Sequence, residues 1–197
     1  MSKTVEFYFD LGSPASYLAW IQLPALCARH GATLVYRPML LGGVFQATGN
    51  ASPAMIPAKG RYMFTDLGRY ARRYGVPFGM PAGFPVNTLT LMRGVIGMQL
   101  RSPAQFDALL AALFRGLWEQ QRNLSDAATL AATLSLAGFD PAAFQALAAD
   151  GEVKAELKRE TEAAVARGVF GAPTCFVGGE MFFGQDRLDF VEEALSR

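Results

Sequence analysis

The sequence is poor in the residues that most metal and redox sites need. It has two cysteines, Cys27 and Cys175, which lie far apart and form no CxxC motif. Its single histidine, His30, stands before Gly31, where a helix is expected to end and where the helix dipole favours a histidine. A disulfide framework, a zinc site, an HExxH metal site and a Ser-His-Asp triad therefore have no support, and we expect no bound metal.

Charged side chains are also few, at 18%, and the formal net charge is +1. The densest positive cluster, Arg69, Arg72 and Arg73, is typical of a solvated helix face, so we expect no nucleic-acid partner. Walker and GxGxxG motifs are absent. No apolar run approaches the roughly 20 residues that span a bilayer, and the start of the chain lacks a signal-peptide pattern. We expect a cytoplasmic protein without a membrane partner.

What the sequence does have is hydrophobic content, 51% of 197 residues, which is enough for a well-packed core. Residues 5–9 are aromatic and β-branched and predict a strand, and residues 33–37 predict a second one. Between them, Ser13-Pro14 favours the start of a helix over 15–29. The first forty residues therefore predict a β-α-β unit with parallel strands and a right-handed crossover.

The middle of the chain changes character. From Pro53 to Gly168 it is rich in alanine and leucine and predicts five or six helices. Helix starts are predicted at a capping box over Ser102–Gln105, at Ser125, and at Asp140-Pro141. Residues 75–85 are rich in glycine and proline and predict a loop.

The end of the chain returns to β character. Residues 174–177 and 180–183 flank Gly178-Gly179, and this pattern predicts a hairpin, because glycine tolerates the positive φ of a two-residue turn. A last helix is predicted over 187–195. The helical block is therefore inserted into an otherwise continuous α/β domain.

Ser13 is the most informative single position. A serine at the start of a helix is commonly just an N-cap, with its oxygen accepting a backbone N–H. The same geometry also suits function. A helix N-terminus carries partial positive charge and spare N–H donors, so it stabilises an anion, to which the hydroxyl can donate one more hydrogen bond.

The order of elements resembles the thioredoxin-like fold with a large helical insertion, as in DsbA-type proteins. Redox members carry a CxxC where this chain has Ser13–Ser16. The stretch Phe7–Ala19 closely resembles the opening of the family of 2-hydroxychromene-2-carboxylate isomerases and kappa-class glutathione transferases. Three later segments agree with the same family: Gly49-Asn50 with Pro57–Gly60, Phe170–Thr174, and Phe183–Leu188. The resemblance implies a discontinuous thioredoxin-like domain, residues 1–45 and 169–197, around an inserted helical domain, 46–168.

The resemblance also implies a glutathione site. Its residues would be Ser13, Asn50, Lys59, Ala172, Pro173, Gln185, Asp186 and Arg187, with Ser13 as the catalytic residue facing the thiol. A cis bond before Pro173 would expose the N–H and C=O of Ala172, with which an extended peptide can pair. Each residue also has a plainer interpretation: Asn50 as a turn former, Lys59 as a solvated side chain, Pro173 as a trans proline and Asp186 as a helix cap.

The function that follows is a glutathione-dependent cis–trans isomerase of 2-hydroxychromene-2-carboxylate or a similar aryl pyruvate, acting in aromatic catabolism such as naphthalene degradation. Reversible addition of the thiolate would let the former double bond rotate. The resemblance implies a homodimer and a small aromatic substrate. Four aromatic residues are candidate walls for that substrate, although aromatic residues at helical spacing are more often core: Tyr62, Phe64, Phe84 and Trp118.

Three other functions stay open. A kappa-type transferase would use the same glutathione site and release a conjugate. A DsbA-like oxidoreductase needs an attacking and a resolving thiol, which the missing CxxC does not supply, and Cys175 is expected to be buried and inert. A non-catalytic binding or chaperone module on the same fold would have no affinity for glutathione.

Overall fold

The computed structural model describes residues 3–197, which divide into two compact units. The first comprises the chain up to Asn50 and from Glu160 onward, and the second is Ala51–Arg159. The insertion expected at 46–168 is longer than the second unit at both ends. The reason is packing, since α2 (Leu41–Thr48) and the end of α8 (Gly151–Ala166) contribute to the core beside the sheet. No helix within residues 3–197 is long and apolar enough to cross a bilayer.

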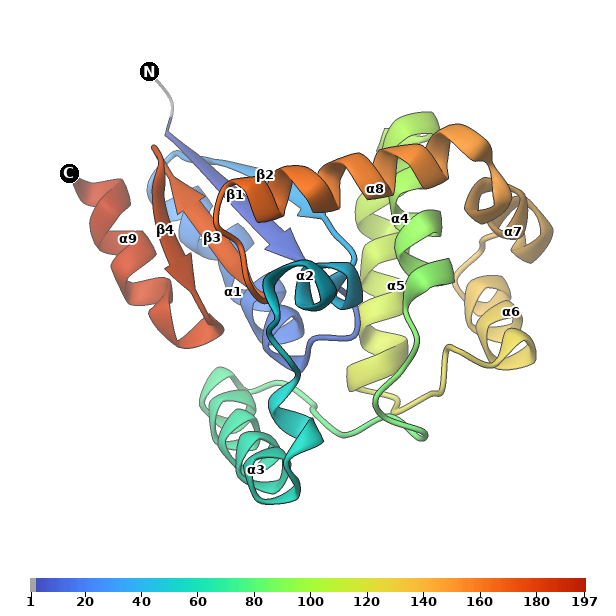
Figure 1. Ribbon diagram of the computed structural model, residues 1–197, viewed down its shortest axis with the longest axis horizontal. Coiled ribbons are helices and arrows are strands. Elements are labelled where there is room, and N and C mark those ends of the chain that lie inside the picture. Colours follow the sequence, from blue (N-terminus) through green and yellow to red (C-terminus); the bar gives the residue numbers. More distant parts are fainter. Residues whose placement is uncertain (1–2) are drawn as a thin grey trace. The chain divides into compact units, whose positions relative to one another are not determined.

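The first unit is built on a four-stranded mixed sheet of order β2-β1-β3-β4 (Figure 1). Its strands are β1 (Thr4–Phe9), β2 (Thr33–Pro38), β3 (Thr174–Val177) and β4 (Glu180–Phe183). β1 and β2 are parallel, whereas β3 is antiparallel to both β1 and β4. The predicted β-α-β unit and the C-terminal hairpin are both confirmed, and Gly178 and Gly179 have the positive φ angles, 63° and 120°, that the tight turn requires.

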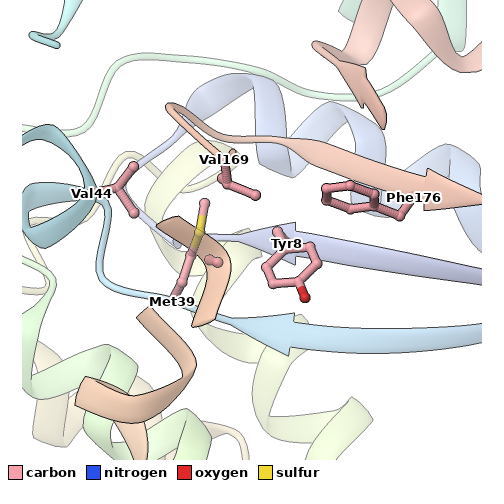
Figure 2. Packing of buried hydrophobic residues seen from close by; sticks show 6 residues of the cluster. Tyr8, Met39, Val44, Val169 and Phe176 are labelled. Carbon is pink, nitrogen blue, oxygen red and sulfur yellow. The ribbon is translucent and has the colours of Figure 1, made fainter. Parts of the chain in front are cut away.

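Helices cover the sheet on both sides, because side chains of β1 alternate between its faces. Tyr8 packs with Phe176, Met39 and Val44 in a buried cluster that also takes in residues after α8 (Figure 2). Phe7 and Phe9 point the other way, with their rings stacked 5.1 Å apart. The remaining helices of this unit, α1 (Pro14–Arg29) and α9 (Leu188–Ser196), pack against the sheet and against each other.

Arg167 fastens the returning chain to the sheet where α8 ends. Its guanidinium donates to Glu6 at 3.0 Å and to the hydroxyl of Tyr8 at 2.7 Å. It also lies 4.0 Å from the centroid of the Phe176 ring, as a cation–π contact. These contacts hold the segment after α8 against β1 and β3.

The second unit is helical, in agreement with the five or six helices predicted. It contains η1 (Pro53–Met55), α3 (Pro57–Tyr74), α4 (Leu89–Arg101), η2 (Pro103–Gln105), α5 (Phe106–Trp118), α6 (Ala127–Leu136), α7 (Pro141–Ala149) and the first part of α8. The loop predicted at 75–85 is present and lies between α3 and α4.

Two of the predicted helix starts in this unit are wrong. Ser102 makes no capping hydrogen bond, because a 3-10 turn at Pro103–Gln105 intervenes before the α-helix begins. α6 is capped by Asp126 instead of Ser125, since the carboxylate accepts a backbone N–H of the first turn. The predicted cap at Asp140 is confirmed, with a proline following it at the first helical position.

Gly94 on α4 allows α7 to pack closely against it. A Cβ built at Gly94 would lie 2.0 Å from Cζ of Phe144, a buried ring. We predict that Gly94→Ala lowers the free energy of unfolding by about 1–3 kcal/mol, because the ring must move in a close-packed core. Chemical denaturation measures this. Gly68→Ala on α3 is the matched control: its Cβ meets only the end of the Arg72 side chain at 3.7 Å, so equal losses for the two variants would contradict the packing argument.

Candidate functional site

The sheet brings distant segments of the first unit to one place. Tyr8, near the end of β1, pairs with Thr174 at the start of β3, which in turn pairs with Phe183 at the end of β4. The segments that follow β1, precede β3 and follow β4 therefore meet at the same end of the sheet. These segments contain most of the residues that the sequence analysis proposed for the glutathione site.

Ser13 lies at the centre of this end and is 4% exposed. Its Oγ is 2.9 Å from the carbonyl oxygen of Ala172 and 3.1 Å from the backbone nitrogen of Ser16. A carbonyl oxygen can only accept, so the Ser13 hydroxyl donates its one hydrogen to Ala172 while it accepts the N–H of Ser16. Ser13 is thus both the N-cap of α1 and a link between α1 and the loop before β3.

The N-terminus of α1 is favourable for an anion. The helix has 16 residues, and no acidic side chain lies in its first turn. The helix dipole and the N–H of Ala15 therefore present positive potential beside the Ser13 hydroxyl, whereas Ser16 and Tyr17 donate their N–H groups to Ser13. A thiolate at this position would be stabilised relative to the neutral thiol.

Ala172 and Pro173 form the opposite wall of the site. The peptide bond between them is cis, as the resemblance implied. The carbonyl of Pro173 accepts the N–H of Gly184 at 3.0 Å, which holds the loop in place. Within residues 3–197 no group accepts a hydrogen bond from the N–H of Ala172. One backbone donor is therefore available to a ligand beside Ser13.

The turn η3 (Gln185–Arg187) packs against α1 and supplies charged groups. Gln185 is buried, whereas the side chains of Asp186 and Arg187 are 41% and 49% exposed and form an ion pair at 2.6 Å. The interpretation of Asp186 as a cap of the last helix is wrong: the N-cap of α9 is Arg187, and no side chain caps it. Asp186 is instead engaged with Arg187.

Asn50 and Lys59 lie in different units. Asn50 follows Gly49, whose φ is 70°, and its amide Nδ2 donates to the carbonyl of Phe170 at 2.8 Å. It therefore supports the loop that leads to Ala172. Lys59 is exposed in the first turn of α3 in the second unit.

The aromatic residues considered as substrate walls lie in the second unit, where three of them form a cluster of rings with Phe78. Phe64 and Phe84 meet edge to face at 5.1 Å, and Phe84 lies 5.9 Å from Trp118, which is completely buried. Phe78 stacks between Phe64 and Trp118. Tyr62 differs, since it is 64% exposed. Of the four candidates, Trp118 is therefore a core residue, whereas Phe64 and Phe84 are half-buried.

Asp10 is a site residue that the sequence reasoning missed. It is 1% exposed, and its carboxylate accepts the N–H of Gly12 and the N–H of Leu41, both at 2.8 Å. Its own carbonyl accepts the N–H of Ser13. Asp10 thus fixes the loop that presents Ser13 and ties it to the start of α2. The available signal was an acidic residue directly after a hydrophobic strand.

A groove of about 600 Å³ lies at the other end of the sheet. Its lining includes Lys3, Glu6 and Glu180 together with the Gly178-Gly179 turn. β1 runs from this groove to the Ser13 end and spans about 17 Å at the usual rise per residue. The groove is therefore separate from the site around Ser13.

Comparison with known proteins agrees with this architecture. The family model of the DSBA-like thioredoxin domain matches residues 4–196. The chain belongs to the DSBA-like thioredoxin domain family. Among curated members it is 34% identical over 198 residues to a 2-hydroxychromene-2-carboxylate isomerase of Sphingobium xenophagum, a match that covers 99% of each chain.

The chain is also similar to two further proteins. Glutathione S-transferase kappa 1 of Homo sapiens is 29% identical over 210 residues, covering 99% of this chain and 92% of its own. The solved structure of a 2-hydroxychromene-2-carboxylate isomerase superposes with a TM-score of 0.86 at 34% identity, covering 98% of this chain and 95% of its own. The DsbA-like thioredoxin fold with a helical insertion is therefore confirmed.

The thiols of this DSBA-like chain are not arranged for redox exchange. Cys27 and Cys175 are buried and unpaired. Burial raises the pKa of Cys27 to about 11 and raises that of Cys175 still further. Ser16, three residues after Ser13, has a buried hydroxyl with no partner within residues 3–197.

We therefore predict that neither cysteine is alkylated by iodoacetamide in the native protein at neutral pH, and that both react in denaturant, because the thiolate is the nucleophile. Mass spectrometry counts the adducts. Rapid native labelling at neutral pH would contradict the burial argument.

The pKa of Cys27 is higher in the folded state than in the unfolded state. The free energy of unfolding should therefore keep its full value below the unfolded pKa of about 8.5 and should decrease as pH rises toward 11.

His30 has a structural role, as expected. It is the C-cap residue of α1, and its Nε2 lies 3.0 Å from Oε1 of Glu192. The same carboxylate accepts a hydrogen bond from Arg29. The hydrogen bond with Arg29 lowers the pKa of Glu192 the most, and the one with His30 lowers it further. The interaction joins the end of α1 to α9.

Proposed function

We propose that this chain is a glutathione-dependent cis–trans isomerase of 2-hydroxychromene-2-carboxylate, or of a similar aryl pyruvate intermediate of aromatic-compound degradation such as that of naphthalene. The observation that carries the proposal is the 34% identity to isomerases of that name over nearly the whole chain, in Sphingobium xenophagum and also in Pseudomonas putida. The geometry around Ser13 supports it, because that end of the sheet suits a thiolate.

The groups around Ser13 fit glutathione. The N–H of Ala172 has no partner within residues 3–197 and lies beside a carbonyl on the same residue, a pattern that an extended peptide can match as an added strand. Asp186 and Arg187 offer a carboxylate and a guanidinium to the ammonium and carboxylate of the γ-glutamyl end. Asn50 and Gln185 belong to the same binding site in this proposal, and Lys59 would pair with the glycine carboxylate.

In the proposed mechanism Ser13 and the first turn of α1 hold the sulfur as an anion. When bound, glutathione would supply a thiolate as the nucleophile for reversible addition to an electron-poor double bond, and it would not be consumed. Ser13 and the helix favour the anion over the thiol, so they lower the thiol pKa from about 8.5. A decrease of about two units corresponds to roughly 2.7 kcal/mol, which a hydrogen bond to a charge and a helix terminus can together supply.

The test of this function is to follow the absorbance of 2-hydroxychromene-2-carboxylate with and without glutathione. The proposal predicts rapid equilibration with its trans-hydroxybenzylidenepyruvate isomer only when glutathione is present, with all glutathione recovered. S-methylglutathione, which lacks the thiol, is the matched control and should support no reaction. Equilibration at the same rate without glutathione would refute the proposal.

A kappa-class-like transferase is the second candidate, favoured by the 29% identity to human glutathione S-transferase kappa 1 over 99% of this chain. It would use the same thiolate and retain it in a product conjugate. Mass spectrometry of the assay mixture separates the two functions. A stable adduct, with glutathione consumed in proportion, assigns the transferase.

The proposal includes a homodimer in the cytoplasm. The edge strand β4 and the neighbouring α9 expose apolar side chains, among them Met181, Phe183 and Phe190. Exposed apolar side chains on an edge strand suit a protein interface. Sedimentation equilibrium should give twice the mass of the chain, and the mass of a single chain would contradict the proposed homodimer. Cell fractionation tests the proposed cytoplasmic location.

A further inference from the structure

The hydroxyl of Ser13 is already engaged. Its one hydrogen goes to the carbonyl of Ala172 at 2.9 Å, and its oxygen accepts from the N–H of Ser16. A hydroxyl in this arrangement has no hydrogen to give to a thiolate. If it simply rotated away, the carbonyl of Ala172 would be left without a donor in a partly buried position, which is unfavourable.

We infer that the carbonyl of Ala172 controls Ser13 through an exchange of hydrogen bonds. The Ser13 hydroxyl donates to Ala172 in the free protein, and it turns to the thiolate when that carbonyl accepts an amide N–H from the ligand. The inference rests on the proposed function and specifies which ligands the site activates. It activates a thiol whose own residue carries an amide N–H, that is, a cysteinyl residue within a peptide.

The groups around Ser13 make this exchange nearly balanced. Before binding, Ala172 uses its carbonyl on Ser13, while its N–H has no partner within residues 3–197. After binding, its carbonyl has a new donor and its N–H an acceptor, both from an extended peptide. The N–H of Ser16 continues to cap Ser13, so the oxygen stays in place and only the O–H bond reorients. With a thiol that has no adjacent amide, the Ser13 hydroxyl would keep its hydrogen bond to the carbonyl of Ala172.

The first experiment compares glutathione with an isosteric ester in which 3-mercaptolactate replaces cysteine, so that oxygen stands where the cysteinyl N–H was. The ultraviolet absorbance of the bound thiolate is titrated against pH with each ligand at saturation. We expect a thiol pKa at least about one unit higher for the ester, which is a tenfold lower ratio of thiolate to thiol at any given pH. Equal pKa values for the two ligands in the wild-type protein would overturn the exchange.

The second measurement does not require the ester to bind. The carbonyl of Ala172 is labelled with ¹³C and observed by NMR in the wild-type protein and in Ser13→Ala. The exchange predicts that the substitution shifts the Ala172 signal in the free protein, where Ser13 is the donor, and leaves it unshifted in the glutathione complex. The same shift in both states would show that Ser13 never releases Ala172.

These outcomes separate the inference from the proposed function. If Ser13→Ala raises the pKa of both bound thiols equally, Ser13 stabilises the thiolate as proposed and the exchange is wrong. If glutathione does not change the Ala172 signal at millimolar concentration and calorimetry detects no binding, both are wrong.

Discussion

Ser13→Ala should lower kcat/KM for the glutathione-dependent reaction by about ten- to a hundredfold while the protein stays folded. The variant loses a hydroxyl that the proposed mechanism directs at the sulfur anion, and a hydrogen bond to a charged group contributes about 1.5–3 kcal/mol. It also loses the N-cap of α1, which costs about 1 kcal/mol of stability. Steady-state kinetics below and above the thiol pKa measures the loss, which should shrink at high pH, where the free thiol ionises unaided.

Ser52→Ala is the matched control for this variant. Ser52 also precedes a proline and also accepts a backbone N–H, from Ala54, but it lies in the second unit. Ser13→Ala should lose more stability than Ser52→Ala, because the carbonyl of Ala172 also loses its donor, and only Ser13→Ala should lose activity. A Ser13→Ala enzyme with the wild-type rate and pH profile would show that Ser13 is only a cap.

Asp10→Ala should be the most destabilising of the substitutions considered, by about 3 kcal/mol or more. The side chain is 1% exposed, and its removal leaves the N–H groups of Gly12 and Leu41 without their acceptor. Hydrogen bonds to a charged group contribute about 1.5–3 kcal/mol each, so two together make the expected sum. Because the same loop presents Ser13, we also expect weaker glutathione binding in the fraction that is folded. Urea denaturation and calorimetry measure these two effects.

Asp140→Ala is the control for Asp10→Ala. Asp140 is exposed at the start of α7, and its carboxylate accepts one N–H, that of Ala142. Its removal should cost about 1 kcal/mol and should leave glutathione binding unchanged. Similar losses of stability for the two variants would mean that Asp10 is no more than an ordinary cap.

The parts of the fold that could be predicted are those in which a local signal decides the structure. The aromatic and β-branched run of β1, the serine and proline before α1, and the two glycines of the hairpin each act within a few residues. α2 (Leu41–Thr48) was missed because it contains two glycines and has no capping side chain. Its first N–H is instead satisfied by Asp10, which lies 31 residues earlier in the chain.

The candidate site depends on contacts between residues far apart in the sequence. Ser13 and Ala172 are separated by 159 positions and meet only because β1 and β3 are neighbours in the sheet. No local pattern indicates that contact: the Ser-Pro helix start singled out Ser13, and Ala172 was proposed only from the family resemblance. The capping box at Ser102 and the helix cap at Asp186 failed for the related reason that a local pattern does not exclude a competing turn or ion pair.

In the proposed mechanism the start of α1, with Ser13, holds glutathione as a thiolate. A pH titration of the ultraviolet absorbance of glutathione bound to the wild-type protein tests it most directly. We predict a bound thiol pKa of about 6.5, roughly two units below the free value, because the helix terminus and the hydroxyl favour the anion. A bound pKa at or above about 8.5 would contradict the account.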